Sequence, residues 1–143
     1  MNEDIRRLVA AGDLREAARL LGRPFTVEGV VVEGDRRGKL LGFPTANLDL
    51  APPEQALPPR GIYVGSALGH RAAISIGVNP HYGGTTLRVE AHLLDFDGDL
   101  YGQRLVVELW QYLRDEAAFE SEEALVAQIA LDVEATRGAV RPD

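Results

Sequence analysis

Helical periodicity in this chain of 143 residues is confined to its two ends, and glycine and proline divide the middle into short β-branched runs. Such a chain is poorly suited to strand–helix–strand units, which need a helix between successive strands. Short strands at close spacing instead favour an antiparallel sheet that closes into a barrel. The sequence therefore predicts one mainly β domain with helices at its ends.

Residues 1–21 are predicted to be helical, with an interruption at Gly12-Asp13. Asp13 is a good N-cap for a second helix, and Gly22 stands where a glycine commonly ends one. The pattern allows two short helices or one helix bent at Gly12. Residues 1–21 are accordingly separated from the rest of the chain, residues 22–143, as short N-terminal helices.

A second helical segment is predicted near the C-terminus, from the N-cap Ser121 to about Arg137, with Gly138 ending it. Its apolar stripe would consist of Leu125, Ile129 and Val133. The tail that follows, residues 141–143, is expected to be loose.

Between the helices the apolar period changes to that of strands. Strands are predicted at residues 25–33, 46–50, 62–68, 72–78, 87–96 and 104–113. A tight turn is expected at Gly69-His70, and Asp97-Gly98 predicts a two-residue hairpin that pairs the last two strands. Residues 51–60 contain four prolines and are predicted to be a loop, because proline cannot donate to a strand ladder.

Composition excludes several classes of function. The chain has no cysteine, which rules out disulfides, cysteine nucleophiles and thiolate metal sites. Its net charge of −7 argues against nucleic acid as a partner. No run approaches the roughly 18 apolar residues of a membrane helix, and the N-terminus lacks the apolar core of a signal peptide. We therefore expect a cytoplasmic protein with no membrane partner.

The segment Gly34–Leu48 combines three glycines, three cations and a Pro-Thr-Ala-Asn tetrad directly after a predicted strand. Glycines allow tight turns whose backbone N–H groups can surround an anion. Thr45 and Asn47 alternate, so in extended chain their oxygens point the same way and suit Mg²⁺ or phosphate contacts. The spacing does not match the common phosphate-loop patterns. The segment is either a phosphate and metal clamp or a glycine-rich surface hairpin with solvated cations.

The predicted strand at residues 87–94 places Arg88, Glu90 and His92 on one face. Glu90 is a candidate general base, which must lie within hydrogen-bond reach of the proton that it removes. The alternative is an ordinary polar outer face of a half-buried strand.

Late in the chain, aromatic residues accompany a single arginine. Trp110, Tyr112, Tyr101 and Phe119 can stack on a planar ligand or pack against the barrel. Arg114 can contact a ligand or form a salt bridge at the barrel rim. The histidines are too scattered in the sequence to indicate a metal site.

Six segments, in this order and spacing, resemble the riboflavin kinase family: Leu40–Leu48, Pro59–Tyr63, Ile76–Pro80, Val89–Phe96, Asp99–Gly102 and Tyr112–Phe119. The resemblance spans residues 21–137. Phe-Pro-Thr-Ala-Asn after a glycine-rich segment is highly specific to that family. The similarity is greatest to the C-terminal kinase module of bacterial bifunctional riboflavin kinase/FAD synthetases.

The resemblance implies a six-stranded antiparallel Greek-key β-barrel, residues 22–143, preceded by linker-like helices at residues 1–21. It implies Mg²⁺-dependent transfer of the ATP γ-phosphoryl group to the ribityl 5′-hydroxyl of riboflavin, giving FMN and ADP. Two alternatives remain: a non-catalytic flavin- or nucleotide-binding regulatory domain, and a small-molecule kinase with another nucleotide donor.

The resemblance also implies roles for individual residues. Thr45 and Asn47 would hold Mg²⁺ and the nucleotide phosphates, and Glu90 would be the base at the flavin hydroxyl. Arg114 and Phe119 would lie against the isoalloxazine ring. The remaining residues on the nucleotide and phosphate side would be Gly34, Gly38, Lys39, Gly42 and Pro44.

The bifunctional enzymes carry a nucleotidyltransferase module with a His-x-Gly-His signature, which does not occur in this sequence. We therefore expect no FAD synthetase activity from this chain. An N-terminal FMN adenylyltransferase module in the natural protein is a partner consistent with the resemblance.

Overall fold

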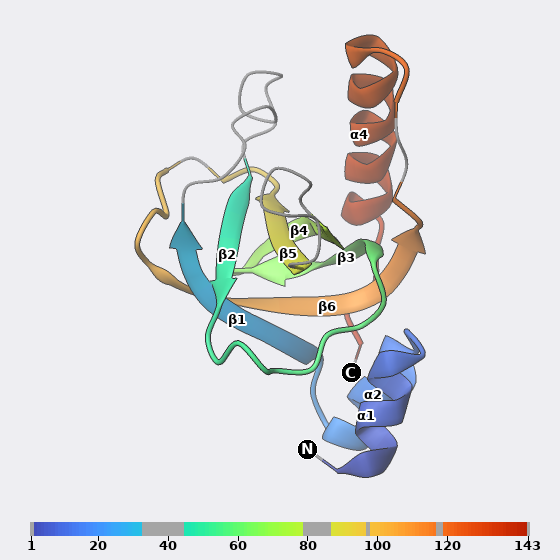
Figure 1. The fold of residues 1–143 in the computed structure, drawn as a ribbon. Helices are drawn as coiled ribbons and strands as arrows, with labels where there is room; N and C mark the ends of the chain where they lie inside the picture. Colours follow the sequence, from blue (N-terminus) through green and yellow to red (C-terminus); the bar gives the residue numbers. More distant parts are fainter. Residues whose placement is uncertain (1, 33–44, 79–86, 97, 117–118, 143) are drawn as a thin grey trace.

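The computed structural model describes residues 2–32, 45–78, 87–96, 98–116 and 119–142. Within these residues, six antiparallel strands close into a barrel in the order β1-β2-β5-β4-β3-β6 (Figure 1). The strands are β1 (Phe25–Val32), β2 (Ala46–Leu50), β3 (Gly61–Ala67), β4 (His70–Val78), β5 (Leu87–Leu93) and β6 (Arg104–Arg114). The meander of β3, β4 and β5, with β2 beside β5, is a Greek key. The predicted mainly β barrel is confirmed.

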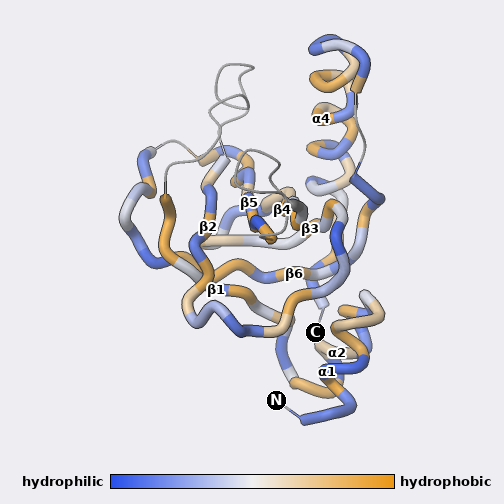
Figure 2. The backbone as a smooth tube through the Cα atoms, viewed as in Figure 1, coloured by the Kyte–Doolittle hydropathy of each residue, from blue (hydrophilic) through white to orange (hydrophobic). Residues whose placement is uncertain are grey.

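In β1 and β5 the barrel interior is built by alternation of buried and outward-facing residues. In β1 every second residue from Phe25 is buried, and in β5 Val89, Ala91 and Leu93 point inward while Glu90 lies on the outer face. Figure 2 shows hydrophobic and hydrophilic residues mixed along the barrel strands. This alternation fixes the register of these two strands, because a one-residue slip would move the whole apolar set of a strand to the outside.

The N-terminal segment forms two helices, α1 (Glu3–Ala10) and α2 (Leu14–Leu21). The Asp13 side chain accepts a hydrogen bond from the backbone N–H of Glu16, and Gly22 ends α2 with a left-handed φ of 77°. The predicted cap and stop are confirmed. Ile5 and Leu14 belong to the same apolar cluster as the barrel interior, so the helix pair seals one end of the barrel.

The predicted hairpin at Asp97-Gly98 is wrong. β5 pairs with β2 and β4, whereas β6 pairs with β1 and β3. β5 already ends at Leu93, shortly before Asp95 adopts a left-handed φ of 58°, so the chain leaves the sheet and crosses to the other side. Both edges of each strand are occupied, and local turn chemistry cannot reveal that.

The tight turn between β3 and β4 falls one residue earlier than predicted. Leu68 and Gly69 both have positive φ, 52° and 77°, which is the conformation of a type I′ hairpin turn. His70 is therefore the first residue of β4 rather than part of the turn. Leucine is an unusual residue at such a position.

The C-terminal helix α4 (Glu122–Arg137) packs over β3 and β4 and runs beyond the end of the barrel (Figure 1). The Ser121 side chain caps it by accepting from the backbone N–H of Ala124, as predicted. Its buried residues, however, are Asp132 and Thr136, and the predicted apolar stripe is only half-buried. None of the described helices is long and apolar enough to cross a membrane.

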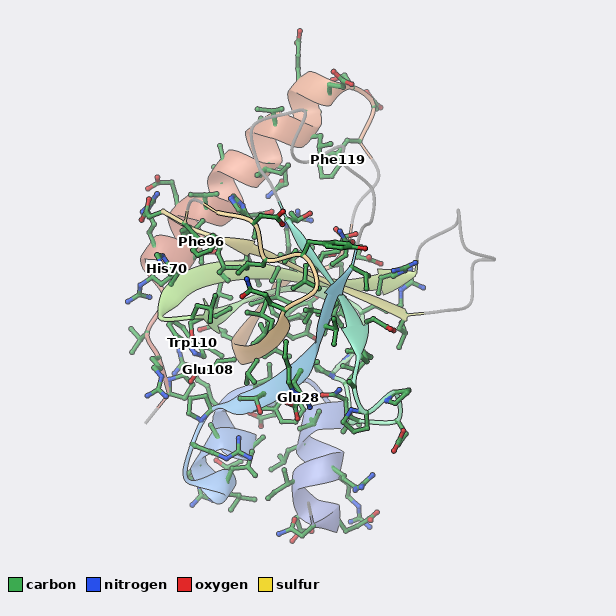
Figure 3. All side chains as sticks on the ribbon, turned by 90° about the vertical axis from the view of Figure 1, so that its left-hand side faces the viewer. Glu28, His70, Phe96, Glu108, Trp110 and Phe119 are labelled. Carbon is green, nitrogen blue, oxygen red and sulfur yellow. The ribbon has the colours of Figure 1, made fainter. Side chains whose placement is uncertain are left out.

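The tail after α4 is held against the barrel, so the expectation of a loose tail is wrong. Pro142 is buried, and both nitrogens Nε and NH2 of Arg141 donate to the Glu108 carboxylate on β6, at 2.9 and 3.0 Å. Trp110 Nε1 donates to the same carboxylate at 2.8 Å, and Figure 3 shows the two residues side by side. An ion pair and a buried proline together hold the tail.

Candidate active site

Asn47 and Glu90 lie directly opposite each other on neighbouring strands. They are Cα partners in the ladder between β2 and β5. Residues opposite each other in an antiparallel pair share a face, with Cβ atoms about 5 Å apart. Glu90 is half-buried on the outer face, whereas Asn47 is only 5% exposed. A carboxylate and a carboxamide from segments far apart in the sequence therefore lie opposite each other on neighbouring strands of the barrel.

The same face continues across the barrel as one row of ladder partners. Glu90 is opposite Ser75 on β4, Ser75 is opposite Ile62 on β3, and Ile62 is opposite Arg114 on β6. Three strand spacings separate Glu90 from Arg114, about 14 Å along the sheet. The row thus runs around the closed barrel from Asn47 and Glu90, at one end, to Arg114 at the other.

Thr45 immediately precedes β2 and is half-buried. It stands two residues before Asn47, so in extended chain both side chains leave the backbone on the same side. Val32, the last residue of β1, is the Cα partner of Asn47, so the chain on either side of residues 33–44 is anchored beside the row. The predicted residues Gly34, Gly38, Lys39, Gly42 and Pro44 lie outside the described residues.

Of the two alternatives predicted for Arg114, a ligand contact or a salt bridge at the barrel rim, the structure shows the salt bridge. Its Nε and NH2 donate to the two carboxylate oxygens of Asp132 on α4, at 3.0 and 2.8 Å. Its NH1 donates to the backbone carbonyl of Asp115 at 2.9 Å. The guanidinium carbon lies 6.0 Å from the centre of the Phe119 ring. The structure therefore brings together Arg114 and Phe119, the two residues predicted for the flavin end.

A charged cluster beside the row was not predicted. Glu116 accepts from Nε and NH2 of Arg60, at 3.2 and 2.9 Å. Its carboxylate lies on the outer face of Gly77: a Cβ added there would be 1.7 Å from Glu116 Oε1. Gly77 is in turn the ladder partner of Arg88. The available signal was Gly77 itself, because an isolated glycine in a strand pattern indicates close approach by another group.

His92 follows Glu90 on the outer face of β5 and is half-buried there. Burial lowers the pKa of His92 below its ordinary value of 6.5, because desolvation disfavours the charged ring. The imidazole is therefore neutral at neutral pH. It adds no positive charge to the site.

The donor set around Thr45 and Asn47 fits Mg²⁺ of the kind that phosphates carry. Hydroxyl and carboxamide oxygens are hard ligands, and Mg²⁺ at phosphate sites takes few protein ligands and keeps water and phosphate oxygens for the rest. Within the described part of the chain, no group of three or more His, Cys, Asp or Glu side chains is arranged to hold a metal. Thr45 and Asn47 thus suit a metal ion that binds together with nucleotide phosphates, rather than one that is held by protein ligands alone.

Comparison with known proteins defines the family. The family model described as "Flavokinase: Riboflavin kinase" matches residues 21–140. The chain belongs to the riboflavin kinase family. The predicted resemblance is thereby confirmed, and the match covers every strand of the barrel and α4.

Curated relatives of this riboflavin kinase domain are longer proteins. "Bifunctional riboflavin kinase/FMN adenylyltransferase" of Pseudomonas fluorescens is 41% identical over 143 residues, covering 96% of this chain and 45% of that protein. The protein of the same description from Listeria monocytogenes is 36% identical over 139 residues, covering 94% of this chain and 44% of that protein. The chain spans less than half the length of these curated relatives.

Two solved structures share the fold of this family member. A crystal structure described as "Macrolide-efflux Protein from Streptococcus pneumoniae" has a TM-score of 0.87 at 35% identity, covering 98% of this chain and 47% of that one. The crystal structure of riboflavin kinase from Trypanosoma brucei has a TM-score of 0.57 at 29% identity, covering 80% of this chain and 78% of that one. The second extends the likeness to a protein described as a riboflavin kinase alone.

Proposed function

We propose that this chain is an ATP:riboflavin 5′-phosphotransferase, which converts riboflavin and ATP to FMN and ADP. One observation carries the proposal: in a chain of the riboflavin kinase family, Glu90 lies opposite Asn47 across a strand ladder. That pairing supports a role for the Glu90 carboxylate as proton acceptor and for the Asn47 carboxamide oxygen as ligand of a metal-bound phosphate.

In the proposed reaction, the Glu90 carboxylate accepts the proton of the ribityl 5′-hydroxyl. The hydroxyl oxygen forms a bond to the γ-phosphorus of ATP, and the bond from that phosphorus to the β–γ bridging oxygen breaks, leaving ADP. Such transfers pass through a loose transition state, so that the protein contributes mainly position and charge stabilisation. Strand pairing on both sides, to β2 and β4, fixes the backbone of Glu90 and supports this role.

On the nucleotide side, the Thr45 hydroxyl and the Asn47 carboxamide oxygen would hold Mg²⁺ and the phosphates. Bound Mg²⁺ would supply charge neutralisation on the transferred phosphoryl group. Asn47 is buried, so its carboxamide is held in one orientation at low entropic cost on binding. Gly34, Gly38, Lys39, Gly42 and Pro44 complete this half of the proposed site, with Lys39 adding positive charge.

On the flavin side, Arg114 and Phe119 would lie against the isoalloxazine ring. Leu125 and Ile129 share the helical face of Asp132 and are half-buried, which adds apolar surface next to this pair. The row from Glu90 to Arg114 runs about 14 Å along the sheet. The row follows the curve of the closed barrel, and the proposal assigns the ribityl end of one riboflavin to Glu90 and the ring end to Arg114.

The family match does not support the two alternatives, a non-catalytic regulatory domain and a kinase with another nucleotide donor. We further propose that residues 22–143 are the kinase domain, that residues 1–21 are its linker-like helices, and that the reaction takes place in the cytoplasm. The relatives' description suggests an FMN adenylyltransferase module as a partner of this domain.

The test is direct. The purified chain is incubated with riboflavin and MgATP, and separately with FMN and MgATP, and the flavins are separated by chromatography. FMN in the first reaction and no FAD in the second are expected. Absence of FMN would contradict the proposed activity, and FAD in the second reaction would contradict the expectation of a single activity.

A further inference from the structure

Asp132 on α4 is the one charged side chain that is buried within the described residues, and it is 7% exposed. The rest of its helix face carries no fully buried apolar residue: Leu125 and Ile129 are half-buried, and only Thr136 joins Asp132 in the interior. A helix that docks on a sheet usually does so through an apolar stripe. Here the buried carboxylate of the helix docks through an ion pair with Arg114.

The geometry of that ion pair is fully determined. Both oxygens of Asp132 accept from Arg114, and Gln128 one turn earlier donates to Asp132 Oδ1 at 3.0 Å. With the bond from NH1 to Asp115, the contacts use three of the five N–H donors of the guanidinium. The plane of the Arg114 side chain is therefore fixed relative to the barrel.

Stability alone does not account for this arrangement. Replacing a buried ion pair by apolar residues of similar volume is often neutral or stabilising, because desolvation offsets the attraction. Half-buried Leu125 and Ile129 already lie on the same helix face, so an apolar residue at position 132 would extend an existing apolar surface. What an ion pair with two parallel hydrogen bonds adds is orientation.

We propose that Asp132 is a positioning residue that orients Arg114 toward the isoalloxazine end of riboflavin. The proposal rests on the proposed riboflavin kinase function. Arg114 stands at the far end of the row that begins at Glu90, and Phe119 lies beside its guanidinium. Asp132 thus sets the position of the ring end of the substrate while Glu90 acts at the ribityl end.

The test compares Asp132→Asn with the wild-type chain. Asparagine keeps the volume but loses the charge and one of the two parallel hydrogen bonds. We expect the KM for riboflavin, and its Kd from flavin fluorescence quenching, to rise about five- to tenfold, the size of the net contribution of one ordinary hydrogen bond. The KM for MgATP and kcat are expected to stay within about twofold, because the phosphate end is untouched.

The matched control is Asp95→Asn. Asp95 also anchors α4, accepting from NH1 and NH2 of Arg137 at 2.7 and 3.0 Å, but it lies away from the row. Asparagine tolerates the left-handed φ of Asp95. Its riboflavin KM is expected to be unchanged. An equal rise in both variants would overturn the proposal, because the effect would then come from general loosening of α4.

A double-mutant cycle completes the test. If Asp132 acts through Arg114, then Asp132→Asn in an Arg114→Ala background should raise the riboflavin Kd no further. An additional rise as large as in the wild-type background would overturn the proposal. If Asp132→Asn formed FMN at the wild-type rate with an unchanged riboflavin KM, this inference would be contradicted and the proposed function would not. A wild-type chain that neither forms FMN nor binds riboflavin would sink the proposed function as well.

Discussion

Glu90 on β5 and Asn47 on β2 face each other across a ladder that joins segments more than forty positions apart in the sequence. This relationship predicts that Glu90→Gln lowers kcat by about 100-fold or more, the usual contribution of a positioned general base. KM for riboflavin and for MgATP should change little, because glutamine keeps the shape of the side chain.

The measurement is steady-state FMN formation with thermal unfolding as a check on the fold. Asp49→Asn is a suitable control, because Asp49 is an exposed carboxylate two residues after Asn47 on the same strand face. The control should retain wild-type kcat. Equal loss in both variants would mean that charge on this face, rather than the Glu90 carboxylate, supports turnover.

Thr45 and Asn47 should respond differently to truncation. Thr45→Ala removes a half-buried hydroxyl outside the strand, so we expect lower turnover and a higher Mg²⁺ requirement with little loss of stability. Asn47→Ala removes a carboxamide that is 5% exposed, so it should also cost about 1–3 kcal/mol of unfolding free energy. Mg²⁺ titrations of FMN formation and urea unfolding separate the two effects. Wild-type turnover in Thr45→Ala would refute its assignment.

The local parts of this fold could be predicted from the sequence. Asp13, Gly22 and Ser121 act through neighbours within a few residues, so cap and stop patterns located them. Strand alternation likewise placed Glu90 on the outer face. The pairing of Glu90 with Asn47 was different: it depends on β2 inserting beside β5, and only the family resemblance brought the two residues into one site.

The wrong predictions have one physical cause: contacts with residues that are distant in the sequence override the local pattern. Asp97-Gly98 is a good hairpin sequence, but β2 and β4 occupy both edges of β5. The apolar stripe predicted for α4 is only half-buried, and Asp132 is buried instead. Its partner Arg114 belongs to β6, so the periodicity of the helix sequence could not reveal the ion pair. The tail was expected to be loose because its partner, Glu108, also lies far away in the sequence.

Two glycines on neighbouring strands should differ sharply in their tolerance of alanine. A Cβ at Gly65 would lie 1.8 Å from the backbone oxygen of Glu108, so β3 and β6 must separate. A Cβ at Gly77 would meet the end of the flexible Glu116 side chain, which can move. We expect Gly65→Ala to cost about 2 kcal/mol or more, as overpacking does, and Gly77→Ala much less.

Gly77→Ala should nevertheless be detectable in another way. Displacing Glu116 breaks its ion pair with Arg60, so Arg60→Ala should have little further effect on stability in that background. Thermal unfolding of the four combinations checks this. Additive losses would show that Glu116 keeps its place when Gly77 gains a methyl group.

His92 predicts a pH dependence of stability. Burial lowers its pKa in the folded state below the ordinary 6.5, so the unfolded chain binds a proton more readily. The contribution of His92 is full above pH 6.5 and falls as the pH drops toward its folded pKa. In His92→Gln the decline of unfolding free energy just below pH 6.5 should become shallower. Urea titrations at a series of pH values measure the slope, and an unchanged slope would contradict the assignment.

The Glu108 carboxylate holds together the docking of the C-terminal tail. Hydrogen bonds from Arg141, with smaller contributions from Trp110 and Ser66, lower the pKa of Glu108 below its ordinary 4.5. The stability from these contacts is therefore present above that value and is lost as the pH falls through the folded pKa. Trp110 is 3% exposed, so its Nε1–H loses a buried acceptor when Glu108 is truncated.

Glu108→Ala should accordingly cost about 1–3 kcal/mol, the penalty for leaving a buried donor unsatisfied. Arg141→Ala removes a partner that is 56% exposed, so solvent screening should keep its cost below about 1 kcal/mol. Both variants should keep the wild-type KM for riboflavin, because the tail lies at the other end of α4 from Phe119 (Figure 3). Chemical denaturation and FMN formation test this pair together. If both substitutions lowered the unfolding free energy equally, the stabilisation would come from the surface ion pair between Arg141 and Glu108 rather than from the hydrogen bond of the Trp110 indole.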